Sequence, residues 1–589
     1  MKYLAIFVAI LFLGFSGIAG FNDMQPKEKF VQSAEAETIS LEKTNLSLML
    51  VANKPEVPVY TKVYVFPAGS RFSVEAKPIH VEKMENVHLK ASYIPSPPGY
   101  EIKEGGYDDG IIYPEKWYSY EAMGGIKDGE HVIIVILHLY PVRYVAGEIL
   151  YANKFEVTIK YEAPKKPLFT KDEYDFLIIA PSGWKDELQP LKEHKEARGI
   201  KTIIVGLDEI YGGKYFATQG RDDAEKIKYF IKNAIEEWGI EYVMLVGGRK
   251  PGLKEDWWIP VRYAHVYWVD ETKYVSDLYY ADIYDANYSF SSWDTDSNNR
   301  FSEWRSYGEL LDDMDLYPDV YIGRLACRNK VELKIMVEKI MSYENSKASN
   351  KIVLVGGDNF EQEGIEGEIV CDKTMEYLPG FEAAKVYASQ TDVSAKTIKD
   401  TLGDGAAFIH MHGHGSPIYW STHKPDGFDK WEPGIGIWDL PTFFNKEYPI
   451  VVIGGCHTAM FNVSLTIHPW TGGIPAPEGL SWWFARKYGG GGIASFGYTA
   501  FPVATPGNEG DLDGDGIDEP DCVESGYGYM QLGLFKAYGE EGKEFLGECW
   551  GYAVARYIEH FKIPYQRWHL HTIQSFVLLG DPTLKIGGY

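Results

Sequence analysis

The chain has 589 residues, a hydrophobic content of 45% and an aromatic content of 15%. This length exceeds what one hydrophobic core supports and predicts roughly two to four domains, while the composition excludes a disordered chain. The formal net charge is −26. So large an excess of acidic residues argues against a nucleic acid partner, because phosphates are bound through Lys and Arg.

Residues 1–20 have the order of a signal peptide. A charged start at Lys2 precedes an apolar run from Leu4 to Phe15, and small residues follow as far as Gly20. The run is too short for a membrane anchor, and no later stretch is apolar enough to span a bilayer. We therefore expect a secreted, soluble product without stable membrane association after signal removal.

The cysteine pattern limits the role of disulfides and zinc. The five cysteines are Cys327, Cys371, Cys456, Cys522 and Cys549. An odd number in an exported chain leaves at least one free thiol, with up to two disulfides among the others. Their irregular spacing excludes a Cys-rich zinc module.

The segment 21–166 has the pattern of an all-β domain. Short apolar segments such as 60–66 and 131–137 are separated by Pro- and Gly-containing turns, for example at 96–99. A linker rich in Pro and Lys, 163–167, marks its end. We expect a β-sandwich or barrel-like domain here.

From Tyr174 onward, strands alternate with helices. The predicted strands are 176–180, 201–205, 242–248, 319–325, 351–355, the runs beginning at 406 and 450, and 492–496. The predicted helices are 184–198, 222–238, 329–345, 478–488, 525–539 and 543–560. Such alternation indicates α/β architecture, with mostly parallel sheets covered by helices. We divide it into two halves, 167–350 and 351–589.

Two of the predicted strands end in glycine beside a reactive side chain. One ends at Gly413-His414-Gly415, and the other ends at Gly455-Cys456. Their separation matches one strand–helix–strand step, so both side chains would lie at the ligand-binding edge of a parallel sheet. A lone buried Cys or His is usually structural. The pair favours nucleophilic catalysis, with His414 as base for Cys456.

The ordered set of motifs resembles the gingipain-like cysteine peptidases, relatives of caspases and legumains. It comprises Gly413–Ser416, the strand ending at Cys456, and the segments 242–248, 319–325 and 578–584. The resemblance implies a caspase-like catalytic domain in two halves, preceded by a propeptide-like domain over 21–166 and made as a zymogen. It also implies endopeptidase activity on protein or peptide substrates, no organic cofactor, and an oxyanion hole formed by the backbone amides of Gly415 and Cys456.

Two other functions are compatible with parts of this pattern. His410, His412 and His414 alternate along one strand face and could bind zinc in a metal-dependent hydrolase. That interpretation lacks an HExxH helix and leaves Cys456 unexplained, so we interpret His410 and His412 as hydrogen-bonded polar groups inside the sheet. A non-catalytic binding module of the same fold is the third alternative.

Two acidic loops have the oxygen-rich pattern of structural calcium sites. In the first, the candidate ligand positions are Asp511, Asp513, Asp515 and Ile517. In the second, they are Asp294, Asp296, Asn298 and Glu303. Calcium takes six to eight oxygen ligands, roughly, and alternating Asp and Asn residues supply several from one loop. Neither loop completes an EF-hand, and the alternative is an acidic surface turn.

A basic residue before the scissile bond is the expected specificity. The resemblance places Glu366 at the bottom of the pocket for that residue. Asp358, on the same strand-end loop, is a second candidate for this role, and Tyr498 and Phe501, beyond strand 492–496, are candidates for the pocket wall. A desolvated carboxylate favours Arg or Lys, because a neutral side chain leaves its charge unpaired. The alternative is that Glu366 is one more solvated acid in a segment that also contains Glu361, Glu363 and Glu368.

Overall fold

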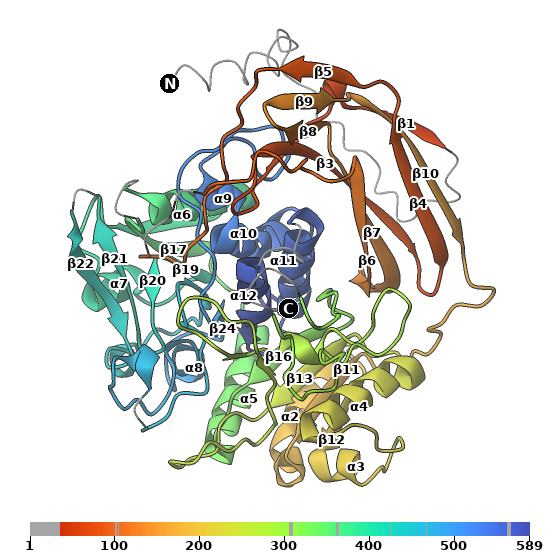
Figure 1. Cartoon of the computed structure of the whole chain (residues 1–589). Coiled ribbons are helices and arrows are strands. Elements are labelled where there is room, and N and C mark those ends of the chain that lie inside the picture. Colours follow the sequence, from red (N-terminus) through yellow and green to blue (C-terminus); the bar gives the residue numbers. More distant parts are fainter. Residues whose placement is uncertain are drawn as a thin grey trace.

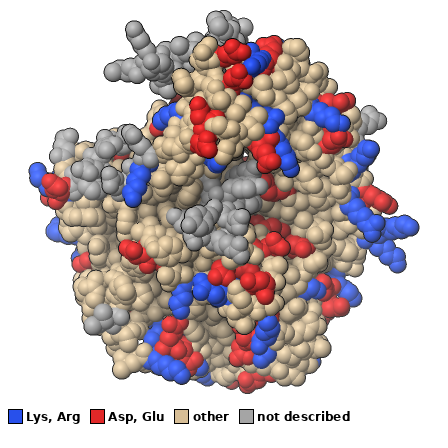
Figure 2. Space-filling model, in the orientation of Figure 1, with Lys and Arg blue, Asp and Glu red and all other residues tan. Residues whose placement is uncertain are grey.

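The computed structural model describes residues 36–100, 103, 105–304, 310–360, 364–425, 427–466, 468–561 and 567–589. The predicted signal peptide therefore lies outside the described residues. An N-terminal β-rich domain arches over a C-terminal α/β body (Figure 1). Within the described ranges, no helix combines the length and apolarity needed to cross a bilayer. On the face seen in Figure 2, Lys and Arg side chains are interspersed with Asp and Glu.

The described part of the N-terminal domain contains three antiparallel sheets. One has the order β2-β3-β7-β6, one β1-β10-β4, and one β5-β9-β8. Its elements are β1 (Glu37–Ser40), η1 (Leu41–Lys43), β2 (Ser47–Met49), β3 (Val57–Pro67), β4 (Arg71–Pro78), β5 (Glu82–Glu85), β6 (Tyr118–Lys127), β7 (Glu130–Leu139), β8 (Val142–Val145), β9 (Glu148–Tyr151) and β10 (Lys154–Glu162). The prediction of a β-rich N-terminal domain is confirmed.

Strand β7 explains how this domain attaches to the rest of the molecule. Ile133, Val135 and Leu137 pack in the core of the N-terminal domain itself. The alternate residues Ile134 and Ile136 belong to the large core of the α/β body. Because successive side chains of a strand point to opposite faces, the uninterrupted apolar run of β7 serves two cores at once. Burial of this surface holds the two domains together.

The first half of the α/β body contains a parallel sheet of order β12-β11-β13-β16. Its elements are β11 (Phe176–Ala180), η2 (Ser182–Trp184), α2 (Lys185–Glu196), β12 (Thr202–Gly206), α3 (Leu207–Tyr211), α4 (Asp223–Trp238), β13 (Tyr242–Val246), β14 (Tyr263–Ala264), β15 (Tyr274–Val275), η3 (Leu278–Tyr280), β16 (Tyr321–Leu325) and α5 (Lys330–Glu344). Helix α4 begins after Asp222, whose side chain accepts from the amide of Glu225, and ends at Gly239 with φ 79°.

The second half contains a six-stranded sheet of order β18-β17-β19-β23-β24-β25, parallel except for β25. Its elements up to the central strands are β17 (Lys351–Gly356), α6 (Glu366–Tyr377), β18 (Glu382–Tyr387), α7 (Ala395–Leu402), β19 (Phe408–His412) and β23 (Ile450–Gly454). The remaining ones are α8 (Leu480–Arg486), β24 (Ala494–Tyr498), α9 (Asp521–Glu524), α10 (Gly526–Gly539), α11 (Leu546–His560), α12 (Arg567–Ser575) and β25 (Phe576–Leu579). Residues of α6, α10 and α11 pack on one face, and residues of α7 and α8 pack on the other.

The predicted fold class is confirmed: mostly parallel sheets covered by helices follow a β-rich domain. The expected helix between the two central strands is wrong. The chain leaves β19 through an antiparallel ribbon of β20 (His414–Gly415), β21 (Tyr419–Lys424) and β22 (Gly427–Gly436), and within the described residues 413–425 and 427–449 only the short turn η4 (Leu440–Thr442) is helical. A second short turn, η5 (Pro469–Thr471), follows β23. All five cysteines are buried free thiols, so none of the disulfides that the count allowed is formed.

Candidate active site

The two glycine-flanked strand ends meet at one edge of the six-stranded sheet. Strand β19 pairs in parallel with β23, with Phe408 opposite Ile450 and His412 opposite Gly454. Beyond the strands, Gly455 has φ 146°, and a Cβ atom there would lie 2.7 Å from the amide nitrogen of Gly415. Only glycine allows this close approach. The segment carrying His414 therefore lies directly against the turn carrying Cys456.

The same contacts place the amide of Gly415 against the turn that carries Cys456. A Cβ atom on Gly415 would lie 2.8 Å from the carbonyl oxygen of Cys456 and would also meet the Thr458 side chain. Glycine at 415 thus lets the backbone of β20 pack against the Cys456 turn. This packing is what an oxyanion hole built from the amides of Gly415 and Cys456 requires.

His414 lies in an aromatic and imidazole-rich environment. Its side chain is buried, and its ring centroid is 5.1 Å from those of both His423 and Trp431. The ring also hydrogen-bonds the backbone of Pro98 in the N-terminal domain. Burial, together with the nearby His423 ring, lowers the pKa of His414 to about 3 against the opposing effect of that hydrogen bond. The imidazole is therefore neutral in this conformation at physiological pH.

Cys456 lies in a small apolar cluster with Trp268, Phe501, Val503 and Trp568. Burial, with a smaller contribution from the carboxylate of Glu271, raises the pKa of the Cys456 thiol. A thiol with a raised pKa is a poor nucleophile. In this conformation the pair is a neutral thiol and a neutral imidazole.

A segment of the N-terminal domain lies next to His414 and next to the apolar cluster that contains Cys456. A Cβ atom on Gly99, whose φ is 82°, would lie 3.2 Å from Cε1 of His414. Tyr100 packs edge-on against Phe501 at 5.7 Å between ring centroids. Upstream, Ala504 donates its amide to the carbonyl of Ser96 at 3.3 Å. Residues 96–100 thus occupy the space next to His414, and both His414 and Cys456 are buried.

His410 and His412 are engaged inside the sheet. The Nδ1 atom of His410 is 2.9 Å from the Thr374 hydroxyl, and that of His412 is 2.7 Å from Oε1 of Gln531. The His412 ring also stacks on Tyr527 at 4.1 Å. Within the described ranges, the side-chain groups able to hold a metal consist only of carboxylates. These positions favour the interpretation of both histidines as hydrogen-bonded groups of the sheet over a zinc site.

The predicted specificity residues are buried in this conformation. Glu366 is 3% exposed, and Oε2 of its side chain accepts from the Asn359 amide at 2.9 Å. Asp358 is also buried and accepts from the Phe360 amide at 3.0 Å. The interpretation of Glu366 as a solvated acid is therefore wrong, whereas Glu361 and Glu363 lie outside the described residues.

The two aromatic candidates differ in position. Tyr498 is buried at the end of β24, where its hydroxyl donates to the Tyr527 carbonyl at 3.2 Å. It packs on Phe576 and belongs to the large core of the α/β body. Phe501, by contrast, lies in the apolar cluster around Cys456. Only Phe501 directly adjoins the candidate nucleophile.

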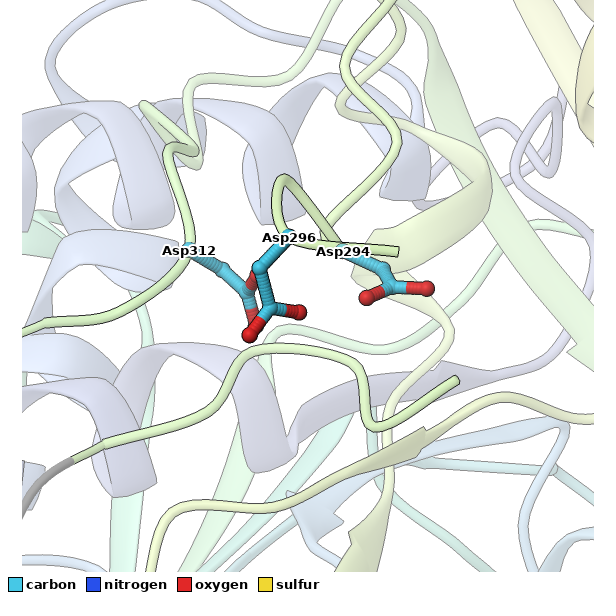
Figure 3. Close-up of side chains that lie close together, drawn as sticks. All are labelled: Asp294, Asp296 and Asp312. Atoms are coloured by element: carbon cyan, nitrogen blue, oxygen red, sulfur yellow. The ribbon is translucent and has the colours of Figure 1, made fainter. Parts of the chain in front are cut away.

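Each acidic loop gathers three carboxylates, one of them from outside the predicted ligand set. Asp511 and Asp513 meet Glu524 of α9. Asp294 and Asp296 meet Asp312, as Figure 3 shows. Each third acid follows its loop after an interruption in the sequence pattern, so spacing alone did not identify it.

The other predicted ligand positions play local roles. Asp515 accepts from the Ile517 amide at 2.8 Å. The Asn298 side-chain amide donates to Glu303 at 2.7 Å and to Asp296 at 2.9 Å. Burial raises the pKa of Asp513 to about 6 and that of Glu524 to about 8. Neighbouring carboxylates repel one another, and a bound cation would offset this repulsion.

Comparison with known proteins identifies the family. A model of Peptidase family C25 matches residues 169–587. Gingipain R2 of Porphyromonas gingivalis is 22% identical over 302 residues, which are 47% of this chain and 32% of that protein. Lys-gingipain W83 of Porphyromonas gingivalis is 20% identical over 464 residues, covering 69% of this chain and 23% of that protein.

Among solved structures, the crystal structure of the Arg specific cysteine proteinase gingipain R matches 72% of this chain and 80% of that chain, with a TM-score of 0.46 and 17% identity. The alignments take in less than a third of the length of each curated relative. The family model, in contrast, spans nearly the whole α/β body and both strand ends described above. The chain belongs to Peptidase family C25.

Proposed function

We propose that the protein is a cysteine endopeptidase acting on proteins or peptides, with Cys456 as nucleophile and His414 as general base. The observation that carries the proposal is the contact between the two strand ends, where Gly455 lies against the His414–Gly415 backbone. Membership of Peptidase family C25 supports the same chemistry.

The proposed reaction begins when His414 takes the proton from the Cys456 thiol and the sulfur attacks the substrate carbonyl carbon. The carbonyl oxygen becomes an oxyanion, which the amides of Gly415 and Cys456 would stabilise. The imidazolium then gives its proton to the leaving amine as the C–N bond breaks. Water, deprotonated by His414, hydrolyses the thioester and restores the thiol.

We further propose that the chain is made as a zymogen, held inactive by residues 96–100. This segment hydrogen-bonds His414 through Pro98 and packs on Phe501 through Tyr100. Burial of both reactive groups opposes formation of a thiolate–imidazolium pair. Cleavage in the exposed linker near Lys165 or Lys166, or at Lys171, would begin release of the domain. The signal-like sequence of residues 1–20 supports secretion of the protein.

The proposed specificity is for Arg or Lys before the scissile bond, with Glu366 as the recognising carboxylate. Glu366 begins α6 beside the end of β19, because a Cβ atom on the adjacent Gly367 would lie against the His412 carbonyl oxygen. Its burial at 3% exposure supplies the desolvation that gives a carboxylate strong discrimination. Displacement of residues 96–100 would be needed to admit a substrate.

We also propose structural calcium at the 511 loop and the 294 loop. The support is the convergence of three carboxylates in each. In the 511 loop, Glu524 also accepts from the amides of Leu512 and Glu519 at 2.8 Å each, so the ligand set is tied to α9. Calcium bound there would increase the free energy of unfolding by mass action.

The central proposal is tested by a peptide-library cleavage profile. Wild-type protein is compared with Cys456→Ala, His414→Ala, His410→Ala and His412→Ala, and thermal unfolding confirms that each variant is folded. We expect no cleavage by the first two variants and a smaller loss in the last two. Full activity in folded Cys456→Ala protein would contradict the thiol mechanism.

A further inference from the structure

The turn that carries Cys456 has an unusual backbone on both sides of the thiol. Gly455 has φ 146°, and His457 has φ 57°. A residue with a Cβ atom in the left-handed region costs roughly 1–2 kcal/mol. Such a conformation persists only where surrounding groups hold it, and it is found most often at functional sites. The contacts of His457 therefore show what holds this turn.

Glu271 makes the main polar contact of the His457 side chain. Its Oε1 atom lies 3.0 Å from Nε2 of His457, and both side chains are 3% exposed or less. The His457 ring stacks on Trp470 at 4.8 Å with an interplanar angle of 17°. On the backbone, His457 donates its amide to the carbonyl of Ala500 at 3.0 Å. The ring is thus fixed from two sides.

Glu271 is itself rigidly placed. Its backbone exchanges two hydrogen bonds with Trp268, at 3.0 and 3.1 Å. Its second carboxylate oxygen accepts from the Phe501 amide at 3.2 Å and lies 3.7 Å from Nδ1 of His571. Glu271 belongs to the first half of the α/β body, between β14 and β15, whereas His457 belongs to the second. The carboxylate therefore connects the two halves at the candidate nucleophile.

Electrostatic activation of the thiol does not explain this carboxylate. A negative charge near a thiol disfavours the thiolate, and Glu271 contributes to the raised pKa of Cys456. A buried carboxylate is also costly unless it is hydrogen-bonded. Its position is instead explained by the geometry that it imposes on the turn.

We propose that Glu271 is a positioning residue that acts through His457 to hold the Cys456 turn in its reactive geometry. This inference rests on the proposed function, in which Cys456 is the nucleophile. The contact of Gly455 with Gly415 fixes one side of the turn, and the Glu271–His457 contact fixes the other. Without the second, the sulfur and the Cys456 amide would spend less time aligned with substrate. Misplacement of about 1 Å can cost about a hundredfold in rate.

The test combines kinetics with a double-mutant cycle in the full chain, after the processing that activates wild-type protein. We expect Glu271→Ala to lower kcat about ten- to a hundredfold with little change in KM, because alignment and not substrate binding is lost. Because Asn adopts the left-handed region more readily than Ala, His457→Asn should retain a higher kcat than His457→Ala. In the His457→Asn background, Glu271→Ala should cost less than about threefold, since the two residues act as one unit.

Lys273→Ala is the matched control, because Lys273 is exposed two residues further along the same turn. It should keep the wild-type kcat. Wild-type kcat in Glu271→Ala, equal kcat in the two His457 variants, or additive effects in the cycle would each overturn the inference. If Glu271→Ala does not fold, the comparison of the two His457 variants decides. Wild-type and Cys456→Ala proteins are assayed in parallel. An inactive wild type or an active Cys456→Ala variant would refute the proposed function as well. If the wild type is active and Cys456→Ala is inactive, a failed prediction concerns the role of Glu271 alone.

Discussion

Gly99 offers the sharpest test of the proposed latency. Its φ is 82°, and a Cβ atom at this position would lie 3.2 Å from Cε1 and 3.3 Å from Nδ1 of His414. In Gly99→Ala, the left-handed backbone alone costs roughly 1–2 kcal/mol. The added methyl group also presses on the imidazole and on the hydrogen bond with Pro98. Both effects weaken the closed state without changing a residue of the proposed dyad.

A free-energy change of one to two kcal/mol shifts a two-state equilibrium by a factor of about 5 to 30. We therefore expect the uncleaved Gly99→Ala chain to show about 5- to 30-fold higher basal peptidase activity than the uncleaved wild type. The assay is the initial rate on a fluorogenic peptide, with gel electrophoresis to show that the chain stays intact. Processed Gly99→Ala and wild-type proteins should have the same activity.

Gly147→Ala is the matched control. Gly147 has φ 79° in the same domain, but its nearest neighbour is the Val87 carbonyl oxygen, 3.8 Å from a Cβ position there. It therefore carries the same backbone strain away from the site. If Gly99→Ala is as inactive as Gly147→Ala before cleavage, residues 96–100 do not control access to His414.

Three further predictions concern specificity, calcium and stability. Glu366→Ala should lose the preference for Arg or Lys, whereas Glu382→Ala, an exposed acid on β18, should keep it in the same peptide library; equal profiles would contradict the pocket assignment. Because the pKa values of Asp513 and Glu524 are raised to about 6 and about 8 in the folded chain, the calcium-free protein should lose stability as pH rises from about 4 to about 8, and calcium should raise the melting temperature more at pH 8 than at pH 5.5. Asp513→Ala should abolish most of that calcium effect, and a melting curve unaffected by chelator at pH 8 would refute the site. Lys339→Met should lower the free energy of unfolding by about 3–5 kcal/mol in urea titrations, because the N–H donors of the buried Nζ are shared among the carbonyls of Ala485, Lys487, Gly490 and Gly492, which would lose them; a change below 1 kcal/mol would show that these acceptors find other donors.

The parallel sheets were predictable because their strands are uninterrupted apolar runs. Strand β23, Ile450–Gly454, is buried at every position, and the glycine that follows marks the end of the strand. Such local patterns predict elements, and the alternation of strands with helices predicts the parallel arrangement. The region of His414 and Cys456 could be located for the same reason, since both residues directly follow such strands.

The contacts that complete the site were not predictable, because they join residues distant in the sequence. Glu271 meets His457 across 186 residues, and nothing near Glu271 marks it as a partner of the Cys456 turn. Pro98 reaches His414 from another domain. The ribbon β20–β22 was missed because its short strands resemble loop sequence, and ribbon pairing depends on the register that the folded chain supplies.

The most direct measurement of the central claim is active-site labelling of the processed protein. All five cysteines are buried free thiols, so selective reaction of one with a peptide-based thiol reagent identifies the nucleophile without assuming it. Peptide mapping should find the label on Cys456 alone, with loss of activity in proportion to labelling, and His414→Ala should slow the reaction. Full peptidase activity in protein completely modified at Cys456 would contradict the proposed mechanism.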